Sequence, residues 1–399
     1  MIAHAVIGAN YGDEGKGLVT DYLASRYDQD DTVVVRFNGG AQAGHTVVLG
    51  DGTRHVHHHF GSGTLAGYPT FLSRHFIVNP IVFTQEWGKI MDLTTRPPTV
   101  WVDPDAPVTT PYDMMLNQAA ELARGSARHG SCGLGINETV QRHEYWPLTV
   151  KELRQSKHVE AFLRQIRKRW VPRRMHQLGL TKLPEYLMND GVIERWLRDV
   201  EIFLASVRER SWGPYWEVAI FEGAQGLRLD AFSADFPYVT RSRTGLTNVV
   251  ELLDQARVPD FDVYYVSRSY VTRHGAGPLP HELAPALLPY PDVRDDTNVP
   301  NPWQQALRFG ALDIERHLQT VVADLARAGG RARPHQVLTC MDQVGDLPIR
   351  MGETMVPQDL FLPWWISLLE GDGLVFYGPT RHDAVPLPHD DRRGKLRLA

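Results

Sequence analysis

The chain has 399 residues, of which 43% are apolar and 22% charged, and its formal net charge at pH 7 is −5. This length allows two domains or one large α/β domain. A chain of this size can bury a substantial core and does not need disulfides or metal ions to stabilise the fold. The slightly acidic balance lacks the basic footprint of proteins that bind nucleic acid polymers.

The cysteines and the N-terminus bear on the compartment. Cys132 and Cys340 are the two cysteines, they lie far apart in sequence, and neither belongs to a CxxC pair. A disulfide framework is therefore not expected, and a reducing compartment fits best. The opening MIAHAVIGANYGDEGKG has no basic start and only a short apolar run, so it resembles neither a secretory signal nor a membrane span. We predict a cytoplasmic protein that does not insert into a membrane.

The first forty residues are typical of the start of a parallel α/β sheet. Residues 3–8 read as a short buried strand, which runs into a glycine-rich turn from Gly12 to Gly17. Apolar residues then recur at helical spacing, and residues 32–37 (TVVVRF) read as a second strand. Strand, turn, helix and strand in this order predict a parallel sheet.

Helices and strands continue to alternate later in the chain. Residues 193–207 carry an apolar stripe at helical spacing, and residues 217–221 (EVAIF) read as a strand that ends in a glycine turn over 222–226. A helix is expected over 314–325, closed by Gly329 and Gly330.

The last predicted strand, residues 336–341, places Asp342 at its C-terminal end. Open α/β sheets bind ligands just beyond the carboxyl ends of their strands, so Asp342 becomes a candidate binding residue.

Three segments depart from this alternation. Residues 146–210 are rich in arginine and tryptophan and are expected to form a helical insertion. The proline-rich stretch 281–303 predicts a long loop, and loops of that length are often functional. The charged end, 386–399, is expected to be an exposed tail on what is otherwise a single domain.

The glycine-rich turn at the N-terminus is a candidate phosphate site. It follows a strand and opens a helix, so its backbone N–H groups and the positive helix end suit phosphate oxygens. Lys16 adds a positive charge, and Asp13 is suited to hold Mg²⁺ or to accept a proton. It is not a Walker A loop, because Asn10 stands where that pattern needs glycine and Gly17 follows the lysine instead of Ser or Thr. The alternative to a phosphate-binding role is a purely structural turn between strand and helix, with its charged side chains in solvent.

Several motifs together resemble the adenylosuccinate synthetase family. YGDEGKG (11–17) is similar to the family's WGDEGKG, and NGGAQAGHT (38–46) to GGxNAGHT. FEGAQG (221–226), PYVT (237–240), TRHGAGPLPHEL (272–283, against TRVGAGPFPTEL), TCMD (339–342, against TKLD) and YGP (377–379, against STGP) follow in family order. These matches span nearly the whole chain.

The resemblance implies a fold and a reaction. The fold is one large α/β unit around a mostly parallel sheet with helices on both faces, like P-loop NTPases but without a Walker A loop. The reaction uses GTP, or ATP, and Mg²⁺ to phosphorylate the 6-oxygen of a purine nucleoside monophosphate, after which L-aspartate displaces the phosphate. The partners would be these small molecules and a second copy of the chain in a homodimer.

The resemblance also implies site residues. Catalysis would fall to Asp13, His45 and Lys16, with the metal held by Asp13 and the Gly44 carbonyl. The triphosphate would be bound by residues of three motifs, namely Gly12, Glu14, Gly15, Lys16, Gly17, Gly44, Thr46, Asp342, Gly378 and Pro379. The purine monophosphate would contact Asn38, Gly39, Ser131, Cys132, Arg142, Gln225, Thr240 and Arg273, with Arg142 reaching across a dimer interface.

The chain departs from the family where the amino acid should bind. The family closes this site with TTGRRRR, whereas here Thr297 and Asn298 remain and Arg308 is the last of the arginine cluster. Each charged hydrogen bond lost is worth roughly 1.5–3 kcal/mol. Either Arg294, Asn298 and Arg308 rebuild the site, or the amino acid is not aspartate.

Two further segments, HVHHHFGSGTLAG and RHGSCGLGINET, are more similar to the bacteriophage branch, which includes 2-aminoadenylosuccinate synthases acting on dGMP. Those enzymes replace the catalytic aspartate, whereas Asp13 is retained here, which favours IMP or dIMP. Ligation on (d)GMP, ligation of another amino acid, and a purine sensor without catalysis remain alternatives.

Four histidines lie close together between positions 55 and 59. His55, His57 and His59 alternate and would share one strand face, with His58 and His75 nearby in sequence. Zinc is one interpretation, but no carboxylate or cysteine joins these histidines at metal spacing, so a structural role is favoured.

Overall fold

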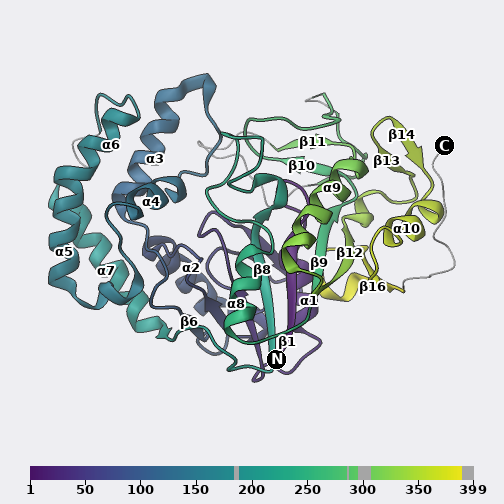
Figure 1. Cartoon of the computed structure of the whole chain (residues 1–399), viewed down its shortest axis with the longest axis horizontal. Coiled ribbons are helices and arrows are strands. Elements are labelled where there is room, and N and C mark those ends of the chain that lie inside the picture. Colours follow the sequence, from purple (N-terminus) through teal and green to yellow (C-terminus); the bar gives the residue numbers. More distant parts are fainter. Residues whose placement is uncertain (184–187, 285–286, 295–306, 389–399) are drawn as a thin grey trace.

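The computed structural model describes residues 1–183, 188–284, 287–294 and 307–388 (Figure 1). One ten-stranded sheet runs through the molecule in the order β16-β15-β12-β9-β1-β8-β2-β5-β6-β7. All of its neighbouring strands pair in parallel except β15 and β16. The prediction of a large, mostly parallel sheet is therefore confirmed.

The strands of this sheet are β1 (Ile2–Gly8), β2 (Thr32–Arg36), β5 (Thr70–Leu72), β6 (Val100–Val102), β7 (Arg208–Glu209), β8 (Val218–Gly226), β9 (Phe261–Arg268), β12 (Ala332–Thr339), β15 (Gly373–Phe376) and β16 (Ala384–Leu387). Three two-stranded sheets lie outside it and pair β3 (His45–Val48) with β4 (Arg54–His57), β10 (Val271–Arg273) with β11 (Arg308–Gly310), and β13 (Ile349–Met351) with β14 (Thr354–Val356).

The α-helices are α1 (Lys16–Ala24), α2 (Pro80–Leu93), α3 (Pro111–Arg124), α4 (Ile136–His143), α5 (Ser156–Gln165), α6 (Val171–Gln177), α7 (Asp190–Ser206), α8 (Thr247–Gln255), α9 (Ile314–Leu325) and α10 (Gln358–Ile366). Short turns of other helix types include η3 (Val150–Arg154), η4 (Ile166–Trp170), η7 (Ala326–Ala328) and η8 (Met341–Gln343). In the described part of the chain, no helix has the length and apolar character that crossing a membrane requires.

Helices cover both faces of the sheet because its central strands are apolar on both sides. On β1, Ala3, Ala5 and Ile7 pack into a core that includes buried residues of α8 and α9. Val6 faces the other way, into a core shared with Leu18 and other residues of α1. Strands buried on both faces are expected in a parallel sheet, so the residue alternation of β1 fixes which helix covers which side.

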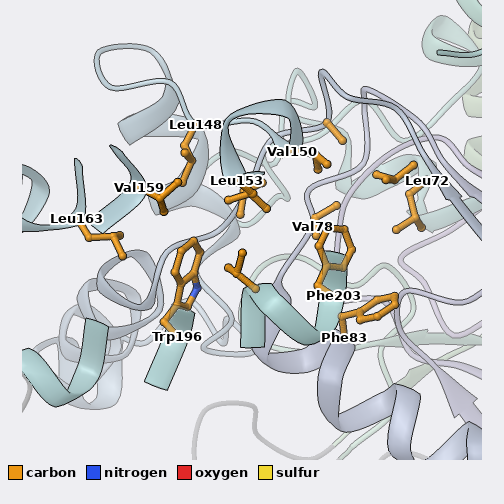
Figure 2. Close-up of a cluster of buried hydrophobic side chains, with 14 of the residues drawn as sticks. Leu72, Val78, Phe83, Leu148, Val150, Leu153, Val159, Leu163, Trp196 and Phe203 are labelled. Carbon is orange, nitrogen blue, oxygen red and sulfur yellow. The ribbon is translucent and has the colours of Figure 1, made fainter. Parts of the chain in front are cut away.

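A second core lies beside the sheet, where the helical segments of 146–210 pack on α2 and α3 (Figures 1 and 2). The predicted stripe of α7 is confirmed, because Ile193, Trp196, Val200 and Phe203 are all buried. Figure 2 shows Trp196 and Phe203 directed toward the apolar side chains of the neighbouring segments. Truncating a buried tryptophan costs roughly 3–5 kcal/mol, so this core fixes the helices firmly to the sheet.

Some boundaries differ from the sequence prediction. β8 does not end at Phe221 but continues through the motif expected as a turn, to Gly226. The segment 146–210 ends in β7, an edge strand paired with β6. Pro386 and Leu387, placed in the exposed tail, belong to β16, and 389–399 lie outside the described residues.

Candidate active site

A cavity of about 650 Å³ opens at the carboxyl ends of the central strands. Its wall combines the turn after β1, the segment before and within β3, the end of β8, and loops from the helical side of the molecule. This size is typical of small-molecule sites, and the place is where open α/β sheets bind ligands. The lining includes nine predicted triphosphate, metal or catalytic residues, namely Gly12, Asp13, Glu14, Gly15, Lys16, Gly17, Gly44, His45 and Thr46.

A buried ion pair holds the turn after β1. The Glu14 carboxylate accepts the backbone N–H groups of Asn10 at 3.1 Å and Gly12 at 2.8 Å, and the Lys16 ammonium at 2.7 Å. Burial alone would raise the pKa of Glu14, but Lys16 and the N–H of Gly12 hold it below its ordinary value. A Cβ added at Gly8 would lie 2.8 Å from Lys16 Nζ, so a larger residue there would displace this ion pair. Since an ammonium has three donors, Lys16 keeps donors for a phosphate.

The same turn presents Asp13 to the cavity. Gly12, Asp13 and Gly15 all have positive φ, and at Asp13 φ is 62°, which is uncommon for a residue with a Cβ. Arg268 donates a hydrogen bond to the Asp13 carbonyl, which supports this conformation. The Asp13 carboxylate lies 3.4 Å from His274 Nε2 and keeps 21% of its side chain exposed. Strained backbone held by its surroundings is common at functional sites.

His45 belongs to a buried charged triad. Its Nδ1 lies 2.6 Å from Glu222 Oε1, while Arg36 pairs with Glu222 Oε2 at 3.1 Å. Ser62 contacts the same carboxylate through its hydroxyl and its N–H. His45 Nε2 has no hydrogen-bond partner among the described residues, and His45 lines the cavity. The triad therefore orients the ring and leaves Nε2 for a ligand.

The electrostatics of this triad favour a neutral imidazole in the ligand-free protein. Burial lowers the pKa of His45, and the opposing attraction of Glu222 is not enough to restore it. Burial opposes ionisation of Glu222, but His45 and Arg36 hold its pKa well below the usual range. An anionic group placed at Nε2 would raise the pKa of His45 and favour its protonation.

Four residues predicted to contact the purine nucleotide lie on the same cavity wall, namely Ser131, Cys132, Gln225 and Thr240. Ser131 exchanges hydrogen bonds with the Asn117 amide, at 2.9 and 3.1 Å, which fixes its hydroxyl in the wall. Burial raises the pKa of the Cys132 thiol to about 11, so it stays protonated and is only a weak donor.

Three other predicted nucleotide contacts do not belong to this wall in the described structure. Asn38 instead joins two segments, accepting from Ala224 N and donating to Arg243 O, both at 2.8 Å. Arg273 is buried, donates to two backbone carbonyls and stacks 4.3 Å over the Tyr11 ring. Gly39 N donates to Ser242 Oγ at 2.9 Å. These residues shape the loops around the cavity.

The prediction that Arg142 reaches across a dimer interface requires correction. The Arg142 side chain is fully buried, and its Nε lies 3.0 Å from the Asp113 carboxylate. Its two terminal nitrogens donate to the carbonyls of Trp146 and Val108, at 2.7 and 2.6 Å. With every part of the guanidinium engaged inside its own chain, Arg142 ties α4 to α3 and is not directed outward.

The remaining predicted residues lie outside the cavity wall. Asp342 follows β12 and Gly378 and Pro379 follow β15, which pairs with β12, so the three lie at the carboxyl edge of adjacent strands. Arg308 grips Glu282 with two nitrogens, at 2.7 and 2.5 Å, and donates to the carbonyls of Gly275 and Gly277. Thr297 and Asn298 are outside the described residues.

The oxygen atoms that line the cavity near the turn are suited to bind a magnesium ion. The Asp13 carboxylate and the Gly44 backbone both line the cavity, next to Lys16. Mg²⁺ prefers oxygen ligands and is usually held by one or two carboxylates plus substrate phosphates. The residues present therefore fit the predicted metal.

Sequence reasoning did not single out Glu222 and Arg36, although a signal was present. Each is a charged residue inside an otherwise apolar strand, and buried charges need partners. The two strands are neighbours, and Arg36 is in register with Glu222. His274 was also missed, and its signal is the replacement of the family's valine by histidine within TRHGAG.

Residues 5–337 match the family model described as adenylosuccinate synthetase. The adenylosuccinate synthetase of Microcystis aeruginosa is 34% identical over 291 residues, covering 70% of this chain and 62% of the relative. That of Cyanothece sp. is 32% identical over 298 residues, covering 71% and 63%. The alignments thus span somewhat less than two thirds of these relatives.

Two solved structures share the fold. A fully ligated adenylosuccinate synthetase from Plasmodium falciparum aligns with a TM-score of 0.62 at 20% identity, over 86% of this chain and 78% of that one. The succinoaminodeoxyadenylate synthetase of cyanophage S-2L, bound to dGMP and to dATP as an energy donor, aligns with a TM-score of 0.58 at 18% identity. That alignment covers 97% of this chain and 95% of the phage chain.

Proposed function

The chain belongs to the adenylosuccinate synthetase family, and from this premise we propose that it is a C–N ligase acting on a purine nucleoside monophosphate. It uses a nucleoside triphosphate to phosphorylate the 6-oxygen of the purine and then joins L-aspartate at C6. The observation that carries the proposal is the convergence of Asp13, Lys16 and His45 on one cavity together with Gln225 and other candidate purine contacts.

The first step requires a base. The 6-oxygen of a neutral purine amide is a poor nucleophile, and removal of the N1 proton turns it into an oxyanion. Asp13 is the carboxylate placed for this transfer, because it faces the cavity from the turn that also carries Lys16. The oxyanion attacks the γ-phosphorus, the bond to the β-phosphate oxygen breaks, and the nucleoside diphosphate leaves.

Charge that develops during this transfer needs stabilisation. Lys16 and the backbone N–H groups of the turn neutralise the phosphates, and His45 Nε2 supplies a donor once the anionic ligand has favoured its protonation. Asp13 and the Gly44 carbonyl, which both line the cavity, would hold Mg²⁺, and the ion would supply positive charge to the phosphate groups.

In the second step, the amine of aspartate attacks C6 and the 6-phosphoryl group leaves as phosphate. This forms the C–N bond and completes the coupling of triphosphate cleavage to ligation. Thr297, Asn298 and Arg308 complete the binding of the amino acid in this proposal, and we infer that Arg308 must exchange its bond to Glu282 for one to the substrate.

The favoured purine substrates are IMP and dIMP. Retention of Asp13 supports them, because a carboxylate beside N1 leaves less room for a 2-amino group. The second candidate is (d)GMP, which is supported by the nearly end-to-end fold similarity to the cyanophage enzyme whose structure holds dGMP. Asp342 supports GTP as the donor, since a carboxylate is suited to N1–H and N2–H of guanine, and ATP is the alternative.

We include a homodimer and a cytoplasmic location in the proposal on family grounds. Since the guanidinium of Arg142 is engaged within its own chain, the proposal gives it no role at the dimer interface.

The test is incubation of the purified chain with Mg²⁺, GTP or ATP, L-aspartate and, in turn, IMP, dIMP, GMP and dGMP, with products followed by mass spectrometry. We expect an aspartate adduct of IMP or dIMP that Asp13→Asn abolishes. An adduct only with GMP or dGMP would select the second candidate. Absence of any adduct and of purine-dependent phosphate release would contradict the ligase proposal and favour a purine sensor.

A further inference from the structure

A cluster of histidines and one glutamate lies under the hairpin that carries His45. His55 and His57 alternate on β4, and β4 pairs antiparallel with β3 so that His57 is opposite His45. Because alternate residues of a strand face the same side, the two histidines point together, and their rings lie 4.6 Å apart between centroids. The third member, Glu86, comes from α2 and is buried.

This contact corrects the expectation that no carboxylate joins the histidines. Glu86 is far from the histidines in sequence, 29 positions after His57. In the folded chain its carboxylate lies 3.7 Å from His55 Nε2. It is oriented by the backbone N–H groups of His58 and His59, each at 2.7 Å. One nitrogen of His55, one of His57 and one oxygen of Glu86 all lie within 4.8 Å of one another.

The histidine nitrogens in this cluster lack other partners. His57 is completely buried, and neither of its ring nitrogens has a hydrogen-bond partner among the described residues. The same holds for His55 Nε2, whose residue is 6% exposed. A buried polar atom left without a partner costs free energy, and native proteins satisfy most such atoms. The cluster therefore has the open lone pairs that a ligand would use.

The chemistry of the three groups suits a cation. The neutral imidazole is the form of histidine that binds metal ions, and a carboxylate oxygen is an ordinary zinc ligand. Each carboxylate oxygen has two lone pairs, so Glu86 can accept its backbone N–H groups and still bind a metal.

We propose that His55, His57 and Glu86 form a buried zinc site that fastens the β3–β4 hairpin to α2. Two imidazoles and one carboxylate form a recurrent zinc ligand set, with a water in the fourth position. With bonds of about 2.0–2.2 Å, tetrahedral ligand atoms lie roughly 3.3 Å apart. Because the three atoms now lie within 4.8 Å of one another, side-chain rotations that bring them closer by at most about 1.5 Å would complete the set. The hydrogen bonds to Glu86 are the outer contacts that orient metal ligands elsewhere. Zinc here would hold the strand that carries His45, separately from the Mg²⁺ of the reaction.

Zinc uptake by the full chain tests the site. The protein is stripped with a chelator, titrated with ZnCl₂ against a chromogenic chelator, and its metal content is then measured by mass spectrometry. We expect one zinc per chain, and a rise in melting temperature with Zn²⁺ that Mg²⁺ does not reproduce. His57→Phe and Glu86→Gln should each lower the zinc content at least tenfold. His75→Gln, outside the cluster, and Asp13→Asn, at the magnesium site, should retain it.

X-ray absorption of zinc in the parent protein gives an answer even if a variant does not fold. We expect two imidazole nitrogens and oxygen in the first shell. A folded parent that takes up no zinc would overturn the site, as would a zinc spectrum with oxygen ligands only. Zinc content unchanged in folded His57→Phe and Glu86→Gln would overturn it equally.

Discussion

His274 Nε2 lies 3.4 Å from the Asp13 carboxylate of the phosphate turn, and both residues line the cavity. The family motif has valine at this position, so the contact is a feature of this chain. We predict that His274→Val lowers kcat about fivefold, because Asp13 loses a polar partner worth roughly 1 kcal/mol that fixes its orientation. His274→Gln, which keeps a donor, should stay within about twofold of the parent. Steady-state rates of adduct formation check this, and a valine variant with the parental kcat would contradict it.

The Glu222 carboxylate is predicted to set the pH range of activity through His45. Glu222 raises the pKa of His45 against the effect of burial, so Glu222→Gln should lower that pKa further. Because the protonated ring is the useful form, activity is present below the pKa and lost above it. The falling limb of the plot of kcat against pH should therefore move to lower pH. Ser62→Ala, which removes a contact to Glu222 without changing its charge, should leave the limb in place.

Removing the Glu222 charge leaves Arg36 without its buried partner and can affect folding. Circular dichroism should therefore establish that the Glu222→Gln protein is folded. An unpaired buried Arg36 costs roughly 3–5 kcal/mol. A folded variant with an unshifted limb would show that His45 does not act in its protonated form.

The Glu282 carboxylate is predicted to compete with the amino acid for Arg308. Arg308 is bonded to Glu282 through two nitrogens, so substrate binding must displace that carboxylate. Glu282→Gln should lower KM for aspartate about three- to tenfold, and Arg308→Met should raise it by tenfold or more. KM for the purine nucleotide should change little in both. Equal KM values for aspartate in all three proteins would remove Arg308 from the amino-acid site.

The Asp324 carboxyl in α9 is predicted to reduce stability at neutral pH. Burial raises its pKa from 3.8 to about 6, while Leu246 N and Tyr265 Oη donate to it at 3.0 Å each. A raised acid pKa means that folding favours the protonated form, so stability falls as pH rises from about 4 to 6 and stays lower above that. Asp324→Asn should therefore raise the free energy of unfolding at pH 7 by roughly 1–3 kcal/mol.

Urea unfolding at pH 7 and at pH 4 measures this difference. The gain should be several-fold smaller at pH 4, because the carboxyl is then protonated in the folded protein and about half protonated in the unfolded chain. Asp372→Asn, in an exposed residue, is the matched control and should show no such pH dependence. A gain of the same size at both pH values would contradict the assignment.

The spacing of apolar residues along the sequence predicted helices and strands correctly where one face of the helix or strand is apolar. The stripe of α7 and the strand–turn–helix start of the chain are confirmed. In α9 the helix is confirmed and Val321 of its apolar stripe is buried, whereas Val322 is 58% exposed. The polar residues His317 and Asp324 are buried on the same face, where Gln336 and Tyr265 bind them. These partners come from distant strands, so periodicity within one helix does not predict that the two polar residues are buried.

The site was predictable to the extent that its residues sit in contiguous motifs. The turn from Gly12 to Gly17 and the His45 segment do meet in one cavity. Arg142 was misplaced because its partner Asp113 lies on another helix, and Glu86 was missed beside His55 for the same reason. Pairings between elements depend on packing, which a single sequence does not specify residue by residue.

The order of strands has a consequence for how the chain is made. β1 lies between β8 and β9, and Ile2 is in register with Val218, so β1 is synthesised about 200 residues before the strands that it pairs with. At 5–20 residues per second this is a wait of roughly 10–40 s. Throughout that time the apolar residues on both faces of β1 and the phosphate turn behind it have no sheet to join. β1 thus remains without its second neighbour until β9, which ends at Arg268, is synthesised, and the cavity, whose wall includes Arg268, cannot be complete before then.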